Sequence, residues 1–278
     1  MESQPLSTIG RPLDFEYPTN RAIGLLSLLV IAAGSVFRLA TGLPLLFSLG
    51  WGLSAGITVF LAWAVTRELD PDRELAAFVS AGLALIGVFW GGRANLALAF
   101  WALLALRMVN HTTGLSATVG DSLGLIGLGG WLTYRGNWGL GLIAVVVFLV
   151  DAYLPRGKNR QWALAGLSAL VGLLARGLGN QIWPAENLPW PHLLGAAAFT
   201  GIFLLVILDT DSVKSTCDRT SEIMQPVRIQ AGQVLTLIIV VEYLIWQGSP
   251  GLWGALPLSA ALLGAVLYRI YEMGFEAG

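Results

Sequence analysis

The chain contains few charged residues and a single cysteine. Only 12% of its 278 residues are Asp, Glu, Lys or Arg, about half the share of an ordinary soluble domain. Because Cys217 stands alone, an intrachain disulfide and a cysteine-based metal cluster are excluded. The net charge of −1 and the lack of a basic run argue against nucleic acid as a partner.

Recognisable catalytic motifs are also missing. The sequence contains no G-x-S-x-G, no H-E-x-x-H and no P-loop. Its two histidines, His111 and His192, fall on opposite sides of the membrane in the topology derived below, so they are not expected to share a metal ion or a haem. We therefore predict no cofactor, with Mg²⁺ as an option only if the protein is an enzyme.

Apolar residues fill the chain instead. The hydrophobic fraction is 55% and the mean hydropathy is +0.70, more than a chain of this size can hide in its own core. The partner that covers this surface is a lipid bilayer. Apolar runs predict about ten transmembrane helices, of which the fifth is short and glycine-rich and is expected to be broken or to form a re-entrant pair with its neighbour. Their expected ranges are 21–41, 44–66, 75–91, 94–109, 122–134, 138–154, 161–179, 193–208, 231–247 and 252–271.

Lysine and arginine predict the orientation of these helices. With ten spans and an internal N-terminus, four of the 16 basic residues face outward, and the other twelve face the cytoplasm. The four are Arg38, Arg93, Arg135 and Arg176. Because basic loops stay in the cytoplasm, this bias predicts a multi-pass protein of the cell membrane with both termini inside.

The expected organisation is a cytoplasmic segment, residues 1–20, followed by one all-α transmembrane helical bundle, residues 21–278. The order of helices and loops in 63–136 resembles that in 148–248, which suggests a tandem parallel repeat of the kind found in some transporters. Glycine is abundant, and the spacings Gly52–Gly56 and Gly87–Gly91 favour close packing of helices.

Two acidic loops are candidates for metal binding. Asp70 and Asp72 follow the second predicted helix, and Asp209 and Asp211 follow the eighth, on the same predicted side. Carboxylates facing each other there could hold Mg²⁺ and, through it, a diphosphate. The alternative is that both loops are solvated turns, in which Asp stabilises the start of the next helix.

Glu242 is the candidate for an ion or substrate pathway, because it lies within the apolar run of the ninth helix. An ionisable group in hydrocarbon costs about 2.5–3.5 kcal/mol and should face the bundle beside a partner. Arg38 and Arg176 lie at a similar depth and are the expected partners. A purely structural ion pair, or a carboxyl kept neutral by burial, is the alternative.

Three classes of function remain open. Helix number, short loops and Glu242 favour a transporter or channel-like protein for a small solute or ion. The acidic loops favour a membrane-embedded enzyme acting on a lipid-linked or diphosphate substrate. The lack of a catalytic motif favours a structural or assembly subunit that binds other membrane subunits. The first class is our leading prediction.

Overall fold

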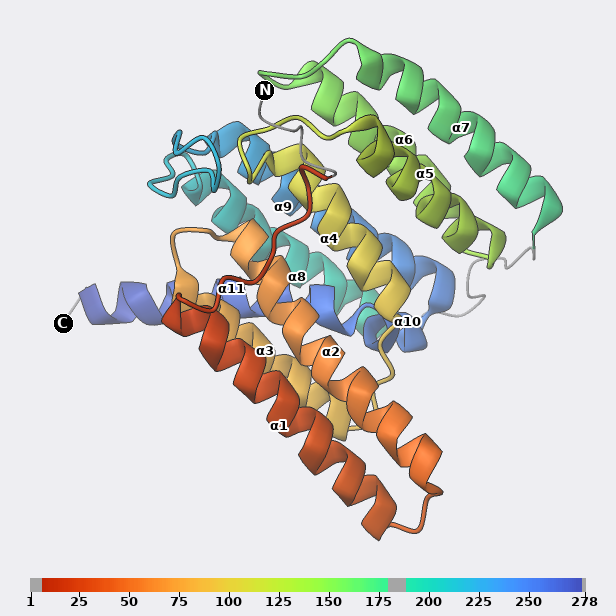
Figure 1. Cartoon of the computed structure of the whole chain (residues 1–278), viewed down its shortest axis with the longest axis vertical. Coiled ribbons are helices and arrows are strands. Elements are labelled where there is room, and N and C mark those ends of the chain that lie inside the picture. Colours follow the sequence, from red (N-terminus) through yellow and green to blue (C-terminus); the bar gives the residue numbers. More distant parts are fainter. Residues whose placement is uncertain (1–6, 180–188, 277–278) are drawn as a thin grey trace. The chain divides into compact units, whose positions relative to one another are not determined.

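The described part of the protein is helical throughout. The computed structural model describes residues 7–179 and 189–276, so the first six residues of the expected N-terminal segment lie outside it. Within those ranges it has eleven helices (Figure 1). They are α1 (Pro18–Ala40), α2 (Leu45–Leu69), α3 (Glu74–Phe89), α4 (Leu96–Asn110), α5 (Val119–Tyr134), α6 (Trp138–Tyr153), α7 (Arg160–Leu178), α8 (Trp190–Asp209), α9 (Pro226–Gln247), α10 (Ser249–Gly254) and α11 (Leu256–Glu276).

Six of these helices are long and apolar enough to cross a membrane, namely α1, α2, α7, α8, α9 and α11. Three others, α3, α4 and α6, are apolar but shorter. A bilayer core of about 30 Å needs about 20 residues of helix. The chain is therefore a multi-pass integral membrane protein built from a helical bundle, as the sequence predicts.

Most helices begin and end within a few residues of the predicted bounds. The fifth is one continuous helix of 16 residues, not a broken one. It begins in a capping box, in which Thr118 and Asp121 each accept a hydrogen bond from the other's backbone N–H. The last predicted helix is preceded by the six-residue α10. The ninth begins at Pro226, five residues earlier than predicted, because Pro is well suited to the first turn of a helix.

The chain forms two compact units. Of the described residues, unit 1 contains 7–11, 100–179 and 189–252, and unit 2 contains 12–99 and 253–276. In unit 2, α1 packs against α2, and α3 and α11 pack against α2 and each other. These divisions differ from the expected repeat, 63–136 and 148–248, which stays a prediction.

Small residues allow close helix packing in unit 2. A Cβ on Gly52 would lie 2.9 Å from the backbone N of Ser35, and one on Gly56 would lie 2.7 Å from the carbonyl O of Ser27. The backbones of α1 and α2 therefore touch where the Gly52–Gly56 spacing predicts it. The second spacing is only half correct: Gly87 packs on Leu256, but Gly91 has a φ of +110° and forms the turn after α3.

In unit 1, α5, α6 and α7 lie side by side (Figure 1), and α9 packs against both α6 and α8. The indole of Trp101 on α4 is fully buried and donates a hydrogen bond to the carbonyl O of Leu125 at 3.1 Å. Helices α6 and α9 run antiparallel, since Asp151 at the end of α6 contacts Arg228 at the start of α9. Both ends of this pair carry polar groups.

Candidate functional site

Four segments meet at one end of unit 1 and form what we call the polar cap, residues 7–11, 111–118, 154–159 and 210–225. The last three connect α4 to α5, α6 to α7, and α8 to α9. The contacts between them include Thr8 with Ser116, Arg11 with Asp218, Arg156 with Glu222, and the Cys217 thiol with the His111 carbonyl. These contacts tie the ends of α4, α6 and α8 to the starts of α5, α7 and α9.

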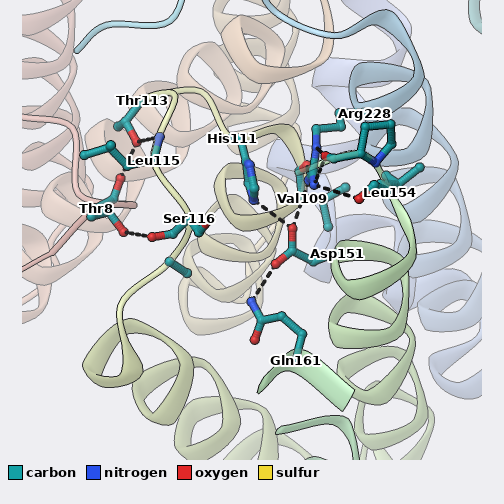
Figure 2. A network of polar contacts seen from close by, with 12 residues as sticks. Thr8, Val109, His111, Thr113, Leu115, Ser116, Asp151, Leu154, Gln161 and Arg228 are labelled. Atoms are coloured by element: carbon teal, nitrogen blue, oxygen red, sulfur yellow. Dashed lines mark hydrogen bonds and ion pairs between the residues drawn. The ribbon is translucent and has the colours of Figure 1, made fainter. Parts of the chain in front are cut away.

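Asp151 is the centre of a buried polar network beneath this cap (Figure 2). Its Oδ1 lies 2.8 Å from His111 Nε2 and 2.9 Å from Arg228 Nη1, while Gln161 Nε2 donates to its Oδ2 at 2.5 Å. The side chains of His111, Asp151 and Arg228 are 4%, 1% and 1% exposed. A buried carboxylate with this many donors is held as an anion in one geometry.

Arg228 is bound on several sides. Its Nη1 also donates to the carbonyl O of Val109 at 2.6 Å, and its Nε and Nη2 donate to the carbonyl O of Pro155 at 2.9 and 2.6 Å. The planar guanidinium thus joins the first turn of α9 to the ends of α4 and α6. This arrangement resists sliding of α9 against its neighbours.

The loops of the polar cap contain strained backbone conformations. Among the described residues, His111, Arg156 and Ser221 are the non-glycine residues with positive φ, at 52°, 68° and 54°. Each lies in a different loop of the polar cap. Such conformations cost about 1–3 kcal/mol and persist where the surrounding contacts enforce them, often at functional sites. The contacts within the polar cap therefore hold these three loops in strained conformations.

Residues 7–11, which precede α1, are part of the cap. The backbone N and Oγ1 of Thr8 lie 2.9 and 3.0 Å from Asp121 Oδ2, and Thr113 Oγ1 donates to the carbonyl O of Thr8 at 2.7 Å. Thr8 and Ile9 are buried. Burial alone would raise the pKa of Asp121, but the hydrogen bonds that it accepts from Ser7, Thr8 and Thr118 hold it below its usual range.

Replacing Asp121 with alanine should therefore release the N-terminal segment and cost about 1–2 kcal/mol, the size of a lost helix cap. Because the folded pKa is lowered, the carboxylate stabilises the protein at neutral pH, and this contribution disappears as the pH falls below about 4. Thermal unfolding between pH 3 and 7, together with proteolysis near Thr8, measures both effects. An Asp121→Ala variant with the wild-type acid sensitivity would contradict this assignment, and Asp211→Ala, in an exposed loop, is the control.

Glu242 lies toward the opposite end of the α6–α9 pair. A Cβ on Gly139 would lie 2.8 Å from its Cδ, so the carboxyl packs directly against the backbone of α6. Both carboxylate oxygens are buried, and neither has a hydrogen-bond partner in the described part of the chain. Leaving such a group unsatisfied costs about 1–3 kcal/mol, and more if it is charged. Glu242 is thus an ionisable residue whose two side-chain oxygens are both buried and unsatisfied within the described residues.

The two arginines predicted to pair with Glu242 lie over tryptophan rings. The guanidinium of Arg176 lies over the ring of Trp138, 4.6 Å from its centroid, and Trp138 in turn packs edge-on against Trp246. Arg38 belongs to unit 2 and lies over Trp51 at 4.5 Å. Since no ion pair to Glu242 forms within the described residues, its role as a pathway residue stays a prediction.

The acidic loops fall in different units. In unit 2, Asp70 is 3% exposed and lies 3.1 Å from Nε of Arg269 and 3.4 Å from Nη1 of Arg73. Burial raises the pKa of Asp70 even though both arginines lower it. Asp70 is thus a buried helix-end residue, and its interpretation as a solvated turn is wrong. Asp72, Asp209 and Asp211 are exposed.

A metal site with several carboxylates does not form in the parts of the chain that the structure describes. No three of their His, Cys, Asp and Glu side chains gather closely enough to hold an ion. Mg²⁺ binding through Asp70, Asp72, Asp209 and Asp211 stays a prediction, because the first two residues belong to unit 2 and the others to unit 1.

Sequence reasoning did not foresee the Asp151 network. No spacing in the sequence signals the contact between His111, Asp151 and Arg228. The one available signal is Arg228 itself, a cation in the first turn of an apolar helix.

No protein-family model, curated protein or solved structure matches this chain.

Proposed function

We propose that this protein is a transporter or channel-like protein for a small ion, in which the carboxyl of Glu242 takes up and releases the ion. The observation that carries the proposal is the buried, unpartnered carboxyl between α9 and α6. Ionisable groups inside membrane helices are expensive and are kept mainly on ion or substrate pathways.

The proton is the ion that best fits this group. Metal cations need several oxygen ligands, six to eight in the case of Ca²⁺, whereas neither carboxylate oxygen of Glu242 has a hydrogen-bond partner in the described residues. A lone carboxyl can still hold a proton covalently. Helices α6 and α9, locked at the polar cap by Asp151 and Arg228, would supply the rigid end of the pathway.

The proposed topology is ten spans with both termini in the cytoplasm. Support comes from each unit by itself. In unit 1, Arg228 and Arg160 lie at the polar cap, whereas Arg176 lies at the Trp138 end. In unit 2, Arg73 and Arg269 meet at Asp70. The basic residues assigned to one membrane face therefore meet within each unit.

The test is proton flux into liposomes that contain the purified protein and a pH-sensitive dye. A potassium gradient with valinomycin supplies the driving voltage. We expect wild-type protein to acidify the lumen faster than protein-free liposomes, and Glu242→Gln to abolish the difference because it cannot bind a proton. Glu16→Gln removes an exposed carboxylate and should behave as wild type. Equal rates in wild type and Glu242→Gln would overturn the proposal.

A further inference from the structure

The loop between α6 and α7 is a cluster of positive charge at a helix end. Arg156, Lys158 and Arg160 fall within five residues, and the sequence contains no acidic residue from 152 to 185. Lys158 is exposed, and the Arg156 side chain is 41% exposed. The acid just before this range, Asp151, is buried against Arg228, so the loop presents a local positive potential.

Two exposed aromatic side chains flank the cations. Tyr153 is the last residue of α6 and is 83% exposed, and Trp162 in the first turn of α7 is 52% exposed. Tyr and Trp prefer the headgroup level of a bilayer. Below them, α7 is a candidate membrane span with a row of exposed leucines, Leu170, Leu173, Leu174 and Leu178. The cations thus lie where an apolar, lipid-facing helix begins.

The loop is also held rigidly. The guanidinium of Arg228 binds the carbonyl of Pro155 from beneath, and Arg160 donates to the carbonyl of Ala117. Gly157 leaves no room for a side chain, since a Cβ there would lie 2.5 Å from the carbonyl O of Ala152. A preformed loop loses little conformational entropy on binding, which favours affinity.

We propose that this loop binds the headgroup of an anionic phospholipid, with Arg156 and Lys158 contacting the phosphate and the acyl chains lying along the exposed leucines of α7. Guanidinium and ammonium groups are the usual protein partners of phosphate. Glu222 is the built-in competitor, because its carboxylate lies 2.7 Å from Nη1 of Arg156. The proposal is independent of the role of Glu242.

Native mass spectrometry of the purified protein with added phosphatidylglycerol or phosphatidylcholine tests this site. Each cation near a phosphate contributes about fivefold in affinity. We expect wild type to retain phosphatidylglycerol preferentially, Lys158→Gln to lose about fivefold, and Glu222→Gln to gain up to about fivefold by releasing Arg156. Arg21→Gln removes an exposed cation in unit 2 and should change nothing.

Three outcomes would overturn the proposal. Equal retention of the two lipids would remove the headgroup preference. A Lys158→Gln variant with wild-type retention, or a Glu222→Gln variant with weaker retention, would place the lipid elsewhere. Full competition by millimolar inorganic phosphate would show a soluble anion site instead of a lipid site. Because Lys158 and Glu222 are exposed side chains, their loss is not expected to unfold the protein.

Discussion

Replacing Asp151 with alanine is expected to lower the free energy of unfolding by about 3–5 kcal/mol, because it leaves the buried guanidinium of Arg228 without its anion. Gln161 and His111 lose their acceptor in the same step. Denaturation of the purified protein in mixed micelles measures the change. Asp211→Ala, which removes an exposed acid of unit 1, should stay within about 0.5 kcal/mol of wild type.

A double replacement separates the charge from the packing. In Asp151→Leu with Arg228→Met both charges are gone, and an apolar pair of similar size can be about as stable as a buried ion pair. We expect the double variant to be more stable than Asp151→Ala alone. A loss below about 1 kcal/mol for Asp151→Ala would mean that the network is not what holds α9 to α4 and α6.

Replacing Glu242 with methionine is expected to stabilise the protein, in contrast to the replacement of Asp151. The carboxyl has no hydrogen-bond partner in the described residues, so its removal should raise the free energy of unfolding by about 1–3 kcal/mol. Methionine is flexible enough to fill the space against Gly139. The gain in stability should come with a loss of proton flux, as expected where a costly group is retained for activity.

The matched control is Gln233→Met on the same helix. Gln233 is fully buried, and its Nε2 donates to Thr210 Oγ1 at 3.1 Å. Removing this donor should lower stability, since Thr210 Oγ1, which itself donates to the carbonyl O of Val206 at 2.8 Å, loses the hydrogen bond that it accepts. A destabilised Glu242→Met variant would instead mean that Glu242 has a structural partner, and the transport proposal would lose its main support.

Apolar runs were sufficient to predict the helices, because in lipid every span must satisfy its own backbone by forming a helix. The largest shift in a helix start is at α9, predicted from residue 231 and found from Pro226. Arg228 makes that stretch polar, yet it is buried in unit 1. Hydropathy cannot distinguish a polar residue in water from one that is paired inside the protein.

The site was predictable only in part. Glu242 stands out because it is a single acid within an apolar run, where an ionisable group is costly. His111, Asp151 and Gln161 do not, because each reads as an ordinary loop or helix-end residue until the fold brings them together (Figure 2). The role of Asp70 was misjudged for the same reason: Arg269, which pairs with it, lies 199 residues away.

The central claim, that the carboxyl of Glu242 binds and releases protons, is tested most directly by reaction with a hydrophobic carbodiimide, which attacks protonated carboxyls in membranes. The account predicts that the label appears on Glu242 and that labelling falls as the pH rises. It also predicts that proton flux into liposomes declines as the labelled fraction of Glu242 increases. Undiminished flux from protein fully labelled at Glu242, or labelling that is the same at every pH, would contradict it.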